Sequence, residues 1–270
     1  MSLNLVSFES DICNAFLLEN FVWRSYGYNW LHLAASGKIS PLALQASSAL
    51  SQSNFGKFHR QNDLKINGSI QYGKAVRSLI PELSNPKRPA AEALIVPIMI
   101  LLIHESLLAD PTGSISHVSG LIRLIMICGP ERFQQEPLRS AFESCRATLI
   151  TIGLISKKRC FPDEENWQSI PWAIEPNSKS PQNYLADILL TVPGMLEDNA
   201  ALRHQYDSTA RATLVGRVQR QLVKLFNWRW NWEKLNQFSA WEELVSLNPN
   251  LPSCTRPRPY LREYILLLRI

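Results

Sequence analysis

Hydrophobic positions are densest over residues 90–108, where the sequence reads AAEALIVPIMILLIHESLL. The uninterrupted apolar run within it extends only from Ala93 to Ile103. A membrane span needs about 20 apolar residues, so this shorter run is typical of a buried helix, and Pro97 predicts a kink in it. A second very apolar helix is predicted over 116–126, after the turn-forming residues 110–113. We therefore expect an antiparallel helix hairpin over about residues 90–128 at the centre of the fold.

Helical spacing of apolar residues recurs along most of the chain. Apolar residues that recur three and four positions apart predict amphipathic helices. This spacing occurs over 11–33, 42–55, 64–83, 136–152, 184–190, 200–226 and 227–244. The alternation WRWNW at 228–232 also fits a strand, but its flanks favour a helix. The predicted fold class is therefore all-α, a multi-helix bundle around the hairpin at 90–128. We expect one helical domain over 1–270, with an internal loop at 160–181.

Composition and charge limit the cellular compartments and the classes of partner that we expect for this chain. The chain of 270 residues is 46% hydrophobic, which suffices for a large core. Residues 201–270 hold 11 Lys and Arg against five Asp and Glu, whereas residues 1–200 hold 17 against 18. Such a basic excess is typical of solvated helix faces or of a surface for an acidic partner. With no apolar leader and no span-length segment, we expect a nuclear or cytoplasmic protein and no membrane contact.

The motifs of several functional classes are missing from the sequence. The five cysteines form no CxxC pair, the five histidines form no HxxxH or HExxH pair, and neither a phosphate-binding glycine loop nor GxSxG occurs. These gaps argue against structural zinc, a disulfide framework, nucleotide binding and serine-nucleophile catalysis. We expect free thiols, no metal and no cofactor.

Three residues of the predicted hairpin carry candidate acid–base chemistry. His104 and Glu105 are adjacent and so point about 100° apart on a helix. His117 lies at the same level on the facing helix, and we expect its imidazole to hydrogen-bond the Glu105 carboxylate. Such a pair acts either as a general acid and base or as a structural pair that satisfies buried polar groups.

Six stretches, in order, match motifs of a known family. They are YGKAVRSL at 72–79, LLIHE at 101–105, SHVSG at 116–120 with GPERF at 129–133, FESCR at 142–146, NWQSIPW at 166–172, and YLADIL at 184–189 with Pro193. Over about residues 42–193 the chain thereby resembles the fungal-specific transcription factor domain, the regulatory domain found downstream of a six-cysteine binuclear zinc cluster.

The resemblance implies a role in transcription regulation. Because only Cys13 lies in the first 120 residues, the zinc cluster that would bind DNA is missing from this sequence. The apolar pattern is also cut off at residues 264–270, so the helical domain is expected to be short at its C-terminus. We therefore expect a regulator or co-regulator, with secondary-metabolite genes as candidate targets. It would act through a protein partner, such as a complete transcription factor, or by sensing an apolar small molecule, without sequence-specific DNA contacts of its own.

The rival hypothesis is an enzyme, and a third possibility is a truncated remnant without a function. A helical bundle with an apolar pocket can fold a hydrophobic substrate for a cofactor-free cyclisation or rearrangement. In that case His104, Glu105 and His117 are the catalytic candidates. For a ligand pocket under either hypothesis the candidates are Tyr72, Arg146, Trp167, Trp172, Trp228 and Trp232. The alternative for each tryptophan is packing in the core or pinning of a loop.

Overall fold

The structure, a computed structural model, describes residues 8–20, 28–83, 88–108, 111–203 and 207–246. Helices and short turns account for these residues, and no strand occurs among them, which confirms the all-α class. In chain order the helices are α1 (Glu9–Asn20), α2 (Tyr28–Ala35), α3 (Pro41–Phe58), α4 (Asn62–Leu83), α5 (Arg88–Leu108), α6 (Pro111–Cys128), η2 (Pro130–Phe133), α7 (Leu138–Ser156), η3 (Phe161–Asp163), α8 (Glu165–Ser169), η4 (Ile170–Trp172), η5 (Pro176–Ser178), α9 (Pro181–Leu190), α10 (Val192–Ala201) and α11 (Ser208–Ser246).

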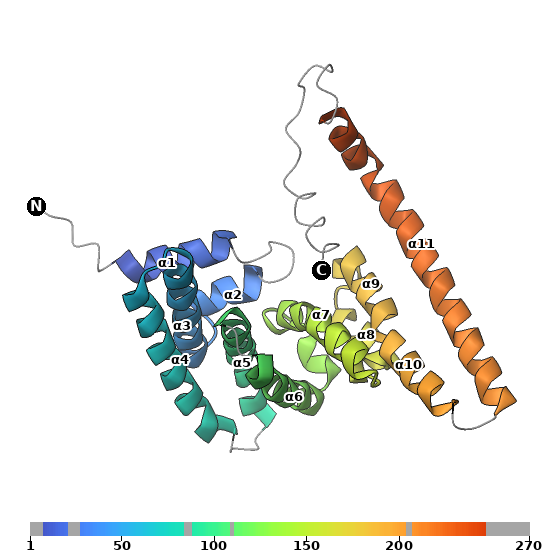
Figure 1. Cartoon of the computed structure of the whole chain (residues 1–270), viewed down its shortest axis with the longest axis horizontal. Coiled ribbons are helices and arrows are strands. Elements are labelled where there is room, and N and C mark those ends of the chain that lie inside the picture. Colours follow the sequence, from blue (N-terminus) through green and yellow to red (C-terminus); the bar gives the residue numbers. More distant parts are fainter. Residues whose placement is uncertain (1–7, 21–27, 84–87, 109–110, 204–206, 247–270) are drawn as a thin grey trace, which may run out of the picture. The chain divides into compact units, whose positions relative to one another are not determined.

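Contacts divide the chain into two compact units (Figure 1). Unit 1 comprises residues 1–152 and 161–178, and unit 2 comprises residues 153–160 and 179–270. The expectation of a single regulatory domain over 1–270 stays a prediction, because a division by contacts does not show whether the two units work separately.

Helix α3 is the meeting point of unit 1, where it packs against α1, α4 and α5. Its start is fixed by Ser40, whose hydroxyl accepts a hydrogen bond from the backbone N–H of Ala43 at 3.0 Å, and by Pro41 in the first turn. Small residues along α3, such as Ala46 and Ala49, are fully buried. They allow the backbones of neighbouring helices to approach closely.

Helix α5 is the apolar segment of residues 90–108, and it contacts α3, α4 and α6. Its described side chains from Leu94 to Leu102 are nearly all buried, with Ile95 and Ile100 fully so. Among the described residues, no helix has the length and apolar content needed to cross a membrane. The central position of the hairpin at 90–128 stays a prediction.

Several helix ends differ from the sequence prediction. The predicted helix over 11–33 is two helices, α1 and α2, and the intervening residues 21–27 lie outside the described ranges. Helix α6 begins at Pro111 rather than Ser116, since proline suits the first turn of a helix. The predicted helix over 200–226 begins instead at Ser208, where the Asp207 carboxylate accepts from the backbone N–H of Ala210 at 2.9 Å.

Unit 2 consists of α9, α10 and α11 together with residues 153–160, which comprise the end of α7 and the turn that follows it. Gly153 is required there, because an added Cβ would lie 2.4 Å from the Cys160 sulfur and 2.7 Å from Pro193 Cγ. The basic residues of this turn also meet α10. Lys158 pairs with Glu197 at 3.0 Å, and Arg159 pairs with Asp198 at 2.9 Å.

Candidate functional site

A cluster of four polar residues connects three helices of unit 1; we call it the Tyr72 cluster. The Tyr72 ring on α4 stacks on the His104 ring on α5, with centroids 4.5 Å apart and planes 11° from parallel. The Tyr72 hydroxyl donates to the Glu105 carboxylate. On the other side, His104 Nε2 lies 2.9 Å from the Ser53 hydroxyl on α3. The cluster therefore links α3, α4 and α5 through side-chain contacts.

Burial controls the protonation of the Tyr72 cluster. His104 is 2% exposed, and this burial lowers the pKa of its imidazole to about 4. Burial also raises the pKa of the Tyr72 hydroxyl, and its hydrogen bond to Glu105 raises it further. At neutral pH the cluster thus holds a neutral imidazole and a protonated phenol.

The Ser53–His104 pair resembles a nucleophile with its base, but a substrate could not reach the Ser53 hydroxyl. Ser53 is 1% exposed. Gly68 of α4 lies directly over it, so that an added Cβ would be 2.2 Å from Ser53 Oγ. A nucleophile has to reach a substrate atom, and here the neighbouring helix fills that space. The arrangement therefore suits the joining of helices better than acyl transfer.

The predicted Glu105–His117 pair stays a prediction, because the His117 side chain lies outside the described residues. The structure shows other partners for the two hairpin residues of α5. The Glu105 carboxylate accepts from Tyr72, and His104 meets Ser53 and Tyr72. Sequence reasoning missed Ser53 and Gly68, since neither belongs to a recognisable motif.

A second cluster in unit 1 surrounds the buried Arg146; we call it the Arg146 cluster. The guanidinium carbon lies 5.1 Å from the Trp172 ring centroid and 5.9 Å from that of Phe142, although Arg146 is only 1% exposed. The Trp172 indole N–H donates to Glu143 at 2.8 Å. Trp167 stands 5.7 Å from Phe142 and is also buried. The tryptophans of 160–181 thus belong to a filled core.

The remaining two candidates lie in unit 2. Trp228 and Trp232, one turn apart on α11, stack with ring centroids 5.6 Å apart and planes 10° from parallel. The Trp228 indole N–H donates to the Pro181 carbonyl at 2.7 Å, which ties α11 to the start of α9. The six pocket candidates therefore fall into three separate groups: Tyr72; Arg146 with Trp167 and Trp172; and the Trp228–Trp232 pair.

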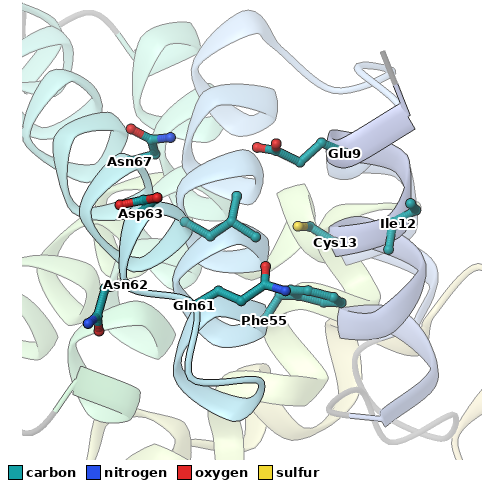
Figure 2. A pocket seen from close by; sticks show the side chains of 9 residues that line it. Glu9, Ile12, Cys13, Phe55, Gln61, Asn62, Asp63 and Asn67 are labelled. Carbon is teal, nitrogen blue, oxygen red and sulfur yellow. The ribbon is translucent and has the colours of Figure 1, made fainter. Parts of the chain in front are cut away.

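A pocket of about 520 Å³ opens between α1 and the α3–α4 connection (Figure 2). In this view Glu9 reaches from α1 toward Asn67 of α4, and the Cys13 sulfur points toward the interior. Burial, followed by the charge of Glu9, raises the pKa of Cys13 to about 11, so its thiol is not an activated nucleophile. Both polar and apolar side chains line the pocket. The lining residues are Glu9, Ile12, Cys13, Phe55, Gln61, Asn62, Asp63, Leu64 and Asn67.

A second pocket, of about 470 Å³, is an apolar groove within unit 2. One wall comes from α9 and α10, including Ile188, Val192 and Met195, and the other from α11, including Val218 and Leu222. Both α11 side chains are substantially exposed. Helix α11 therefore presents apolar surface well beyond what α9 and α10 cover.

Within the described ranges, no three His, Cys, Asp or Glu side chains gather into a group that could hold a metal ion. Searches against protein-family models, curated proteins and solved structures found no match to this chain.

Proposed function

We propose that this chain is a regulatory protein of transcription that acts by binding another protein, like the fungal regulatory domain it resembles. One observation carries the proposal. Val223, Phe226 and Trp230 of α11 are 58%, 65% and 70% exposed and lie on one side of the helix. Clustered exposed apolar side chains of this size mark interaction surfaces.

The packing of the family-like motifs in unit 1 supports a binding module over a sensor of apolar metabolites. Residues of the family-like motifs contact one another there: Tyr72 bonds Glu105, and Phe142 and Arg146 pack with Trp172. These side chains occupy the space that a ligand would need. Four of the six motifs, at 72–79, 101–105, 142–146 and 166–172, are thus accounted for by side-chain packing within unit 1, whereas the motif at 184–189 lies in unit 2.

The enzymatic alternative receives less support from the geometry. A cyclase or isomerase of the expected kind needs an acid or base that lines a substrate cavity. The closest acid–base pair, Ser53 and His104, is buried under Gly68. The accessible pocket of Figure 2 instead holds Glu9, Asp63 and amide side chains over a protonated thiol.

Gene deletion in the organism that encodes the chain separates the two functions. We expect deletion to lower the transcripts of a set of target genes, with secondary-metabolite genes as the first set to measure. Reintroduction of the wild-type gene restores them. Intact transcripts together with accumulation of one biosynthetic intermediate would instead identify an enzyme and overturn the proposal.

A further inference from the structure

Helix α11 carries two apolar seams on opposite sides. The first, formed by Leu214, Gln221, Leu225, Trp228 and Trp232, is partly buried, and α11 contacts α9 and α10. Its members are separated by seven, four, three and four residues. This spacing is that of one heptad stripe. The first seam is therefore the face of α11 that packs against the other helices of unit 2.

The second seam is formed by Gly216, Gln219, Val223, Phe226 and Trp230; we call it the outer seam. Its members are separated by three, four, three and four residues, which is again a heptad stripe. At about 100° per residue, Val223 lies about 180° around the helix from Leu214. No member of the outer seam is buried, and Gln219 at its edge also lines the groove toward α9 and α10. The three apolar side chains of the seam, Val223, Phe226 and Trp230, are the exposed ones described above. A stripe with this period fits a further helix.

The charges beside the outer seam decide which helix fits. In a heptad register with Gly216, Val223 and Trp230 at the first core position, Arg220, Arg229 and Lys234 fall at the flanking positions that face a partner. Between residues 208 and 236 the chain has six Lys and Arg residues and a single acidic one, Glu233, which pairs with Arg229 at 2.7 Å. A second copy of α11 would therefore bring like charges together in either orientation, whereas acidic flanks would be attracted.

We propose that the outer seam binds an amphipathic helix of a partner protein whose apolar stripe is flanked by Asp and Glu. This inference rests on the proposed function and names the class of partner for it. Phe226 and Trp230 form the apolar contact, since large aromatic side chains dominate the energy of such interfaces. Arg220 and Lys234 select the acidic partner and reject basic ones.

A designed probe tests the outer seam on the full chain. The probe is a fluorescein-labelled helical peptide of about three heptads, with Leu at both core positions and Glu at both flanking positions. The control peptide has Lys in place of every flanking Glu. By fluorescence anisotropy we expect the Glu peptide to bind at least tenfold more tightly than the Lys peptide, and this preference to shrink as salt concentration rises.

Matched variants locate the binding. Phe226→Ala and Trp230→Ala should each weaken the Glu peptide at least fivefold, while Phe58→Ala, at an equally exposed phenylalanine of α3, should leave it unchanged. The double variant Arg220→Glu with Lys234→Glu should reverse the preference toward the Lys peptide. Circular dichroism of each variant confirms that the helix content is retained, because these side chains are on the surface.

Three outcomes overturn the proposal. The first is equal binding of the Glu and Lys peptides, and the second is equal binding of the Glu peptide by the Phe226→Ala and wild-type chains. The third is a dimer, seen by analytical sedimentation, that the Trp230→Ala substitution dissociates; a second copy of the chain would then occupy the outer seam. These failures are separate from failure of the proposed function. If deletion lowers transcripts but the peptide test fails, the chain regulates through another surface; if deletion changes no transcript, regulation itself is wrong.

Discussion

The two clusters of unit 1 and the outer seam of unit 2 place aromatic and charged residues in opposite environments. In unit 1 the guanidinium of Arg146 is buried between Phe142 and Trp172, and the imidazole of His104 is buried against Tyr72. In unit 2 the comparable residues are at the surface, with Phe226 and Trp230 exposed beside arginines. The same residue types thus serve stability in one unit and are available for binding in the other. Side-chain chemistry alone does not reveal a site; its exposure does.

The largest effect should come from the buried phenylalanine of the Arg146 cluster. We expect Phe142→Ala to lower the free energy of unfolding by about 3–5 kcal/mol, because it removes a fully buried ring from the core. The exposed counterpart, Phe226→Ala, should change it by less than about 0.5 kcal/mol. Urea unfolding followed by circular dichroism measures both. Similar losses at the two positions would remove the contrast between the units.

The second-largest effect should be a loss of folding stability at acidic pH, caused by His104 of the Tyr72 cluster. The pKa of His104 is lowered from 6.5 to about 4 in the folded chain, so between these values the unfolded chain binds a proton that the folded chain does not. Stability is therefore lost as pH falls from about 6.5 to about 4, by up to about 3 kcal/mol at the lower end. Unfolding curves at pH 7, 6, 5 and 4 would show this loss. His104→Gln should flatten it, and an unchanged pH profile in that variant would contradict the assignment.

A pair of glycines on α4 should give effects of opposite sign. Gly68→Ala would place a Cβ 2.2 Å from Ser53 Oγ and 2.6 Å from the Ser53 backbone nitrogen, so we expect a loss of about 1–3 kcal/mol. Gly73→Ala has no atom within 4 Å and should instead gain about 0.5–1 kcal/mol from helix propensity. Thermal unfolding of both variants suffices. A gain at both positions would mean that α3 and α4 are not packed as closely as described.

The smallest effect should come from the ion pairs of unit 2. Asp198 accepts from Arg159 and also from Arg217. Although burial opposes it, these hydrogen bonds lower the pKa of its carboxyl. Asp198→Asn should cost only about 1 kcal/mol, because partly exposed ion pairs are screened by water. The cost should fall further in 1 M salt, and a loss as large as that of Phe142→Ala would contradict it.

The sequence predicted most helices because their apolar spacing is local. The helix over 64–83 is observed as α4, Asn62–Leu83. One error is the helix predicted over 11–33, which is two helices, α1 and α2. Others lie at helix ends that single capping interactions decide, such as Asp207 at the start of α11. The Tyr72 cluster was beyond local reasoning, because Ser53 and His104 are 51 residues apart and only the packing of α3 against α5 brings them together. The spacing of apolar residues in the sequence is enough to locate the outer seam. Its exposure could not be predicted in the same way, because it depends on which side of α11 packs against α9 and α10.

The two opposite seams of α11 limit how the length of this segment can change during evolution. One inserted residue between Gln221 and Leu225 would rotate everything after it by about 100°, and two would turn Phe226 and Trp230 toward α9 and α10. A seven-residue insertion would preserve both faces to within about 20°. Viable length variants of this helix should therefore differ by whole heptads.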